Sequence, residues 1–452
     1  MQSTNHRVMN KLVVFIGVVF LLGLSSCNRR NEGGELVGAG SRGKYMEPIP
    51  HGMVLIPSGS FTQGINDQDA TWALNSQSKR ISIGAFWMDE TEITNNEYRQ
   101  FVEWVRDSIA RTKLGEQFDE FLNTEDANGN LIEPPTLNWE KEIEWDNEEY
   151  AELLEEMYVP EHERFSSRKE IDARKLIFSF QWVDFKQAAL LSNRYNSETG
   201  EYEGLVDDYQ GGRKSIEDRS SFIIKETLNI YPDTLTWIHD YTYSYNEPLA
   251  EQYFWHPSFD DYPVVGISWK QARAFCRWRT EFHNSALRRV GKYSVPEYRL
   301  PTETEWEYAA RGGIALNLYP WGGDYTRNEK GCFLANFKPL RGSYVDDGGL
   351  VTLRVGTYEP NGYGLYDMAG NVAEWTSAVY AESAYSFTHD MNPNYQYNAL
   401  PSDPPALKRK VVRGGSWKDV GYFLQCGVSS YEYQDTAKSF IGFRCVRTRH
   451  VK

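Results

Sequence analysis

The sequence predicts an α+β fold with little regular secondary structure, interrupted by a long acidic segment. Helix-start signals followed by apolar helical periodicity occur near residues 94, 268 and 302. Short apolar runs typical of strands alternate with glycine-rich turns. Between residues 107 and 250 there are 32 acidic and 14 basic side chains, a net charge of −18, whereas the whole chain carries −15. The remainder therefore sums to about +3, and the acidity belongs to one segment.

Residues 1–27 are typical of a bacterial lipoprotein signal peptide. Arg7 and Lys11 precede an uncharged apolar run over residues 12–24, which is shorter than the roughly 20 residues that span a bilayer as a helix. The run ends in Leu-Ser-Ser before Cys27, which resembles a lipobox, so we expect the thiol of Cys27 to be acylated. An ordinary signal peptide with an incidental cysteine is the alternative.

Residues 28–50 are rich in glycine and polar side chains and predict a tether. By resemblance to bacterial lipoproteins, Asn28 in place of aspartate directs the chain to the outer membrane. Residues 29–34 lack the acidic cluster typical of surface-exported lipoproteins of Bacteroidetes. We therefore expect a lipid-anchored protein that faces the periplasm.

The folded part is predicted to begin with residues 51–106. Thr94 and Glu97 have the spacing of a capping box, and Tyr98, Phe101 and Val105 follow on one helical face. Before this helix, apolar runs predict one strand over 53–56 that enters a tight turn at 57–61, and another strand over 81–88.

We interpret the acidic segment 107–250 as an insertion, because signals of the earlier kind resume only after it. Lys141 is the single basic residue between Glu116 and Glu163. Nucleic acid is therefore not expected as a partner, since phosphate binding needs clustered lysine and arginine. The acidic stretch is either a solvated face or a docking surface for a basic partner.

Residues 251–448 continue the predicted domain. Ser268 and Gln271 form a second capping box, which opens a helix that we expect to run to about Phe282. Thr302 and Glu305 form a third box, and its helix should end at the glycine pair 312–313. Beyond that point the chain is mostly turns and short strands.

Besides Cys27, the chain contains four cysteines: Cys276, Cys332, Cys426 and Cys445. In an oxidising periplasm they could form up to two disulfides. Their spacing does not resemble a zinc site, and the eight histidines are scattered.

Four ordered blocks carry a specific resemblance. They are residues 299–313 (RLPTETEWEYAARGG), 320–322 (PWG), 361–375 (NGYGLYDMAGNVAEW), and 413–417 (RGGSW) with 441–444 (IGFR). They resemble the formylglycine-generating enzyme family, also called sulfatase-modifying factors, over about residues 50–106 and 255–448. The resemblance implies a compact mixed fold related to C-type lectins, with calcium held in loops.

The resemblance also implies particular residues. One calcium site maps onto Asn336, the Phe337 carbonyl, Asp347 and the Gly349 carbonyl, and the other onto Asp367, the Gly370 and Val372 carbonyls and Glu374. Side chains that only cap turns in a metal-free loop are the alternative. Cys276 and Cys445 match a family disulfide that ties a helix to the C-terminal strand.

The chemistry of the family predicts that this chain is not an enzyme. The family's enzymes hold copper with two cysteine thiolates, three and eight residues beyond the serine of the Gly-Gly-Ser block. Here those positions are Asp419 and Leu424, and Cys426 lies two residues further on. Copper(I) is a soft ion, for which a carboxylate is a poor ligand and leucine none. We therefore expect no copper and no oxidase activity.

A narrower resemblance is carried by residues 86–101 and 104–109, together with 34–38 and 51–54. These resemble the GldK/PorK lipoproteins of gliding motility and type IX secretion. That resemblance implies a structural subunit that self-associates in a periplasmic ring with a GldN/PorN-like partner and other secretion components. Two alternatives remain: a lectin-like ligand-binding module that uses loops around Trp321 and Trp375, and a metal-dependent enzyme with altered ligands.

Overall fold

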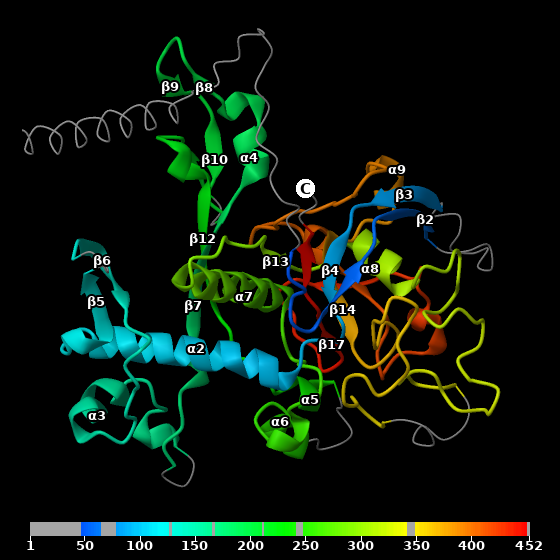
Figure 1. The fold of residues 1–452 in the computed structure, drawn as a ribbon, viewed down its shortest axis with the longest axis horizontal. Coiled ribbons are helices and arrows are strands. Elements are labelled where there is room, and N and C mark those ends of the chain that lie inside the picture. Colours follow the sequence, from blue (N-terminus) through cyan, green and yellow to red (C-terminus); the bar gives the residue numbers. More distant parts are fainter. Residues whose placement is uncertain are drawn as a thin grey trace, which may run out of the picture. The chain divides into compact units, whose positions relative to one another are not determined.

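The computed structural model describes residues 47–64, 78–125, 129–164, 168–209, 212–240, 247–340 and 349–449 (Figure 1). The predicted signal peptide with Cys27, the tether up to residue 46 and the predicted calcium ligand Asp347 lie outside these ranges. Within them, no helix has the length and apolarity needed to cross a bilayer.

The first sheet joins strands from both ends of the domain. Its antiparallel order is β1-β4-β18-β13, formed by β1 (Met53–Ile56), β4 (Phe86–Asp89), β18 (Val446–Thr448) and β13 (Tyr298–Arg299). A separate hairpin pairs β2 (Gly59–Gln63) with β3 (Lys79–Ile83). The strand predicted over 53–56 is therefore confirmed, whereas the single strand predicted over 81–88 is divided into β3 and β4, which belong to different sheets.

The second sheet carries most of the C-terminal blocks. Its order is β16-β15-β14-β17, from β16 (Ser430–Tyr433), β15 (Arg409–Arg413), β14 (Ala373–Val379) and β17 (Ile441–Gly442). Every residue of β14 is buried, as expected for a central strand covered on both faces. β16 forms one edge of this sheet.

Three helices begin at the predicted capping boxes: α2 (Asn95–Leu114), α7 (Trp269–Arg289) and α8 (Glu303–Ala310). The predicted end of α7 at about Phe282 is wrong by seven residues. The sequence after Phe282 loses its apolar periodicity but has no glycine or proline before Gly291, which takes a positive φ of 66°. A polar helical turn can therefore continue until a helix breaker stops it.

The main core lies between α2, α7 and strands of both sheets, whereas α8 packs in a second cluster. Tyr98 of α2 stacks on Phe275 of α7, with ring centroids 5.5 Å apart. Phe101 also meets Phe178, at 5.2 Å, on β7 (Ile177–Val183), which pairs with β12 (Ile223–Asn229). Part of the acidic segment thus contributes to the same core. That the segment is an insertion stays a prediction.

α2 belongs to two hydrophobic clusters. Its first half packs in the main core, whereas Ala110 and Leu114 near its end pack with Phe121, Tyr150 and Leu154. The last two lie on α3 (Glu148–Glu155). The remaining elements are short: β5 (Leu122–Glu125), β6 (Leu131–Leu137), α4 (Phe185–Ala189), β8 (Tyr195–Asn196), β9 (Glu201–Tyr202), β10 (Leu205–Asp207), β11 (Arg213–Ser215), α5 (Thr236–His239), α6 (Glu247–Gln252) and α9 (Ala384–Phe387).

Candidate functional site

The segment that would carry the copper thiolates follows β15. Gly414 and Gly415 have φ values of 90° and 66°, and a side chain on Gly415 would press against the Phe423 backbone at 2.9 Å, so this turn requires glycine. Ser416 Oγ then donates a hydrogen bond to Asp419 Oδ2 at 2.6 Å. Burial raises the pKa of Asp419 above its usual range. The position of the family's first copper-binding cysteine is therefore occupied by a carboxyl group that is hydrogen-bonded within its own turn.

The second predicted position holds an apolar core residue. Leu424 is fully buried in a cluster that contains Tyr319 and Phe337, whereas Cys426 is fully buried in another that contains Trp306. Burial raises the pKa of the Cys426 thiol to about 12, so it stays protonated near neutral pH. A soft metal ion needs thiolates. Asp419 and Leu424 have no sulfur atom, and the Cys426 thiol is buried in the core.

The second predicted calcium set lies in a buried acidic cluster. Asp367 takes a left-handed φ of 55°, and its carboxylate accepts a hydrogen bond from the Gly356 amide at 2.6 Å. Burial raises the pKa of Asp367 to about 6. Glu374 lies on β14 with no exposed surface. We did not predict Glu92, which burial and these two neighbouring carboxylates give a pKa well above its usual range.

One guanidinium compensates this cluster. Arg444 Nη2 lies 2.6 Å from Glu374 Oε1, and both groups are almost fully buried. Glu374 also accepts a hydrogen bond from Trp306 Nε1 at 2.8 Å. Both Glu374 oxygens are therefore engaged, while Glu92 and Asp367 have no salt bridge in the described part of the chain. Their raised pKa values mean that these two groups bind protons more readily than exposed carboxylates do.

The first predicted calcium set adjoins the second. Gly370 approaches Asn336 so closely that an added Cβ would lie 2.4 Å from the Asn336 carbonyl oxygen. The Asn371 amide donates to that same oxygen at 2.8 Å, and the Asn336 side-chain amide donates to the Val351 carbonyl at 2.9 Å. Phe337 is buried in the neighbouring cluster and Gly349 is half-buried. The two loops are therefore held together, as a paired site requires.

These contacts do not by themselves make a metal centre. In the described ranges, no three histidine, cysteine, aspartate or glutamate side chains converge closely enough to hold a metal ion. Half of the predicted ligands are backbone carbonyls, and Asp347 lies outside those ranges. Calcium therefore stays a prediction at both places.

The predicted cysteine pair is brought together in the core. The sulfur atoms of Cys276 on α7 and Cys445 before β18 lie 3.4 Å apart, and both side chains are buried. A disulfide has an S–S distance of about 2.05 Å, and both residues are free thiols in the structure. The geometry fits closure by a small shift, and the disulfide stays a prediction.

The two tryptophans of the lectin-like alternative have different environments. Trp375 has no exposed surface and donates its Nε1–H to the Ile267 carbonyl at 3.1 Å. It is a core residue, so its ring offers no surface to a ligand. Trp321 stacks on Tyr319 at 4.9 Å and is half-buried.

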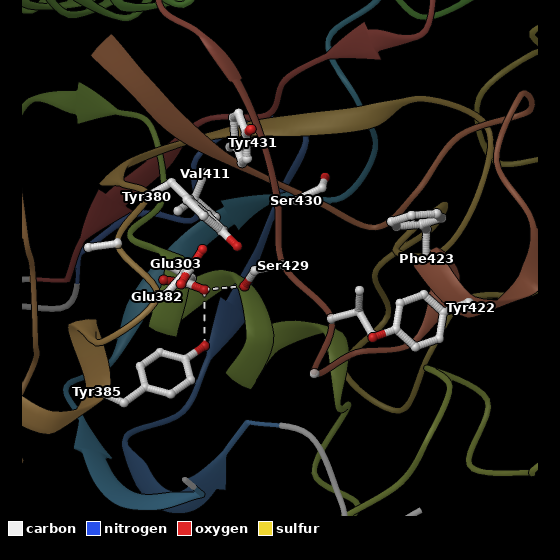
Figure 2. A pocket seen from close by; sticks show the side chains of 13 residues that line it. Glu303, Tyr380, Glu382, Tyr385, Val411, Tyr422, Phe423, Ser429, Ser430 and Tyr431 are labelled. Carbon is white, nitrogen blue, oxygen red and sulfur yellow. Dashed lines mark hydrogen bonds between the residues drawn. The ribbon is translucent and has the colours of Figure 1, made fainter. Parts of the chain in front are cut away.

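A cavity of about 350 Å³ opens beside the segment that follows the Gly-Gly-Ser turn (Figure 2). Its lining combines aromatic rings, hydroxyl groups and carboxylates: Glu303, Tyr380, Ala381, Glu382, Tyr385, Val411, Tyr422, Phe423, Gly427, Val428, Ser429, Ser430 and Tyr431. Figure 2 shows Tyr385 and Ser429 pointing at Glu303, which accepts hydrogen bonds from both, the first at 3.0 Å. We did not predict this cavity from the sequence.

The acidic stretch 116–163 is largely solvated. Part of it forms ion pairs, such as Lys113 with Glu156 at 2.5 Å and Lys141 with Glu120 at 3.2 Å. Most of its other carboxylates are exposed. The surface is therefore strongly acidic at α3, as either interpretation of the sequence requires.

The fold and the Gly-Gly-Ser turn define a domain of the sulfatase-modifying kind, and comparison with known proteins agrees. The family described as "Sulfatase-modifying factor enzyme 1-like domain" matches residues 43–171 and 201–449. Because that match covers most of the sequence, the chain belongs to this family. The prediction of a formylglycine-generating-enzyme-like fold is thereby confirmed.

Individual relatives include active and inactive proteins. Bovine (Bos taurus) formylglycine-generating enzyme is 36% identical over 193 residues, which are 41% of this chain and 44% of that protein. Bovine inactive C-alpha-formylglycine-generating enzyme 2 is 34% identical over 191 residues, 41% of this chain and 50% of that one. The chain thus matches half or less of their length. The solved structure of PvdO from Pseudomonas aeruginosa has a TM-score of 0.42 at 16% identity, over 88% of this chain and 94% of that one.

Proposed function

We propose that this chain uses the sulfatase-modifying fold as a non-catalytic scaffold. The proposal rests on the two positions where the family's enzymes have copper-binding cysteines, because other residues stand there. Asp419 is bonded to Ser416, Leu424 is buried, and the nearby Cys426 is a protonated core thiol. The existence of an inactive relative with the same domain supports this assignment. No copper is expected, and calcium would serve only to stabilise loops.

We further propose that the scaffold is a lipid-anchored subunit of type IX secretion and gliding motility, facing the periplasm from the outer membrane. The support is the resemblance of residues 86–101 and 104–109 to GldK/PorK lipoproteins and the lipobox-like sequence before Cys27. In this role it forms a ring with a GldN/PorN-like partner. α2 begins inside the resembling segment and ends in the acidic region, so one helix connects the anchored domain to the proposed contact surface.

The acidic contact surface is best defined on α3. Glu148, Glu149 and Glu152 are exposed, and none has an ion pair among the described residues. Glu155, in contrast, pairs with Arg164 and Lys169. Carboxylates without a neighbouring cation attract a basic partner more strongly than paired ones. Such attraction mainly raises the association rate and weakens as the salt concentration rises.

Affinity purification of the tagged lipoprotein from native membranes tests this role. We expect a large assembly that contains a second periplasmic protein. A variant with Glu148, Glu149 and Glu152 changed to lysine should recover several-fold less partner at low salt, with a smaller difference at high salt. Glu329→Lys, a single charge reversal at an exposed site outside the acidic segment, is the control for location. Recovery of a monomer alone, or equal recovery by both variants, contradicts the proposal.

The loss of catalysis is tested separately. The purified chain, incubated with copper(I) and a cysteine-containing peptide, should consume no oxygen and form no aldehyde. A Cys426→Ser variant should behave identically, because that thiol is buried and protonated. Turnover that disappears in Cys426→Ser would instead support the metal-dependent enzyme with altered ligands.

A further inference from the structure

The cavity in Figure 2 lies on one face of the second sheet, at its edge. Tyr380 directly follows β14, Val411 lies on β15 and Tyr431 on β16, and all three line the cavity. Val411 and Tyr431 are direct cross-strand partners, and the Tyr380 amide donates to the Arg409 carbonyl at 3.1 Å. Cross-strand partners project to the same face of a sheet. The sheet therefore forms the floor of the cavity.

Carboxylates give the cavity a negative wall. Glu303 is the first residue of α8 and accepts hydrogen bonds from Tyr385 and Ser429. Its nearest cation, Arg413, is 3.7 Å away and lies closer to Glu307. Glu382 is exposed and has no ion pair in the described part of the chain. A positively charged group that entered here would meet one carboxylate without a counter-ion.

Two aromatic side chains of the cavity pack on each other, and one of them already contacts a cation of the protein. The rings of Tyr380 and Tyr431 have centroids 4.7 Å apart and are tilted by 42°. The guanidinium of Arg409 already lies 4.4 Å from the Tyr431 centroid, so this ring accepts a cation at one position in the protein itself. Attraction between a cation and an aromatic face strengthens when water is excluded, as in a cavity.

β16 offers unpaired backbone groups next to this cavity. Among the described residues it pairs only with β15. The Gln434 amide donates to the Lys408 carbonyl at 2.9 Å, and this register turns the N–H and C=O of every second residue, Glu432 and Ser430 included, toward β15. The backbone groups of Tyr431 therefore point outward from the sheet edge.

An added strand would place a side chain in the cavity. A residue that exchanges backbone hydrogen bonds with Tyr431 in an antiparallel strand lies directly opposite it and projects to the same face. That face is the one on which Tyr380 and Val411 line the cavity. Tyr431 is 39% exposed, so the edge is open to a ligand there.

We propose that β16 and this cavity bind an extended peptide segment of another protein by strand addition, with a lysine or arginine inserted beside Tyr380 and Tyr431 toward Glu303 and Glu382. Main-chain hydrogen bonds supply affinity in this mode, and the side-chain pocket supplies specificity. The inference goes beyond the scaffold role, and it uses none of the acidic residues on α3.

Synthetic peptides test the proposal on the full chain by calorimetry. The probe is the acetylated and amidated heptapeptide Thr-Val-Thr-Lys-Thr-Val-Thr. Replacing its lysine with norleucine should weaken binding at least about tenfold, because a charge-assisted hydrogen bond to a carboxylate is lost. N-methylation at the lysine should abolish binding, whereas N-methylation at the following threonine, whose N–H points away from β16, should not.

Protein variants locate the site. Glu382→Gln should weaken binding of the lysine peptide several-fold but leave the norleucine peptide unaffected, and Glu329→Gln is the matched surface control. Unchanged melting temperatures show that both variants fold. Equal binding of the lysine and norleucine peptides, equal effects of the two N-methyl groups, or no peptide binding at all overturns the proposal. Displacement of the peptide by an oligosaccharide would likewise overturn it, in favour of a glycan site.

Discussion

Replacing Arg444 with methionine removes the only basic side chain that forms an ion pair with the described buried acidic cluster. The change leaves Glu374 without its guanidinium partner and the neighbouring Glu92 and Asp367 without a nearby positive charge. It also removes the hydrogen bond that Arg444 donates to the Tyr366 carbonyl at 2.9 Å. Methionine fills much of the same volume, so the effect reports charge and hydrogen bonding rather than an empty cavity.

The expected magnitude follows from burial. Removing one partner of a fully buried ion pair costs about 3–5 kcal/mol, because the other charge remains without compensation. Arg444 and Glu374 side chains are 0% and 1% exposed, so solvent does not reduce this figure. With an unfolding entropy of about 2.1 cal/mol/K per residue, a unit of roughly 400 residues loses about 4–6 °C in melting temperature.

Calorimetry of wild type, Arg444→Met and a control measures the effect. Arg354→Met removes an exposed ion pair with Asp261, whose side chains are 68% and 56% exposed, and should change stability by less than about 1 kcal/mol. The reasoning is refuted if Arg444→Met melts within a degree of Arg354→Met. Such a result would mean that the buried carboxylates are neutral in the folded protein.

Three further predictions concern protons, metal and sulfur. Burial lowers the pKa of Lys410 to about 7, so between about pH 7 and 10 the unfolded chain binds more protons than the folded chain. Wild type should therefore gain stability relative to Lys410→Met as the pH rises, by at most about 1.4 kcal/mol per pH unit. A stability difference that does not change with pH would contradict this. Calcium chloride added after chelation should raise the melting temperature, as binding to the folded state must; an equal rise with magnesium would exclude a selective site. Under oxidising conditions Cys276 and Cys445, 169 residues apart, should form a disulfide whose reduction lowers stability by on the order of 4–5 kcal/mol; two free thiols by mass spectrometry would refute it.

Much of the fold could be predicted because its signals are local. A capping box uses residues three positions apart, and all three boxes, at Thr94, Ser268 and Thr302, start helices as expected. The end of α7 was harder to predict, because the polar turns after Phe282 carry no periodicity and only Gly291 marks the stop.

The site could be predicted only where a motif spans it. Asp367 and Glu374 lie in one sequence block, but Glu92 joins them from more than 270 residues away, through hydrogen bonds to Asn371 and Val372. No spacing rule links such positions. The cavity at β16 is assembled from α8, the end of β14 and the chain after Tyr422. The carboxylates and aromatic rings that line this cavity lie far apart in the sequence and come together only when the sheet forms.

The helix α2 has a mechanical consequence for any assembly built from this protein. It is a continuous helix from Asn95 to Leu114, packed at its first half against Phe275 and at its end against Leu154. Each half is fixed by its own apolar contacts, so no linker intervenes between them. A force exerted on α3 by a bound neighbour would be transmitted through the hydrogen-bonded backbone of α2 into the core. The acidic region would therefore move as a rigid part of the domain and not as a flexible loop.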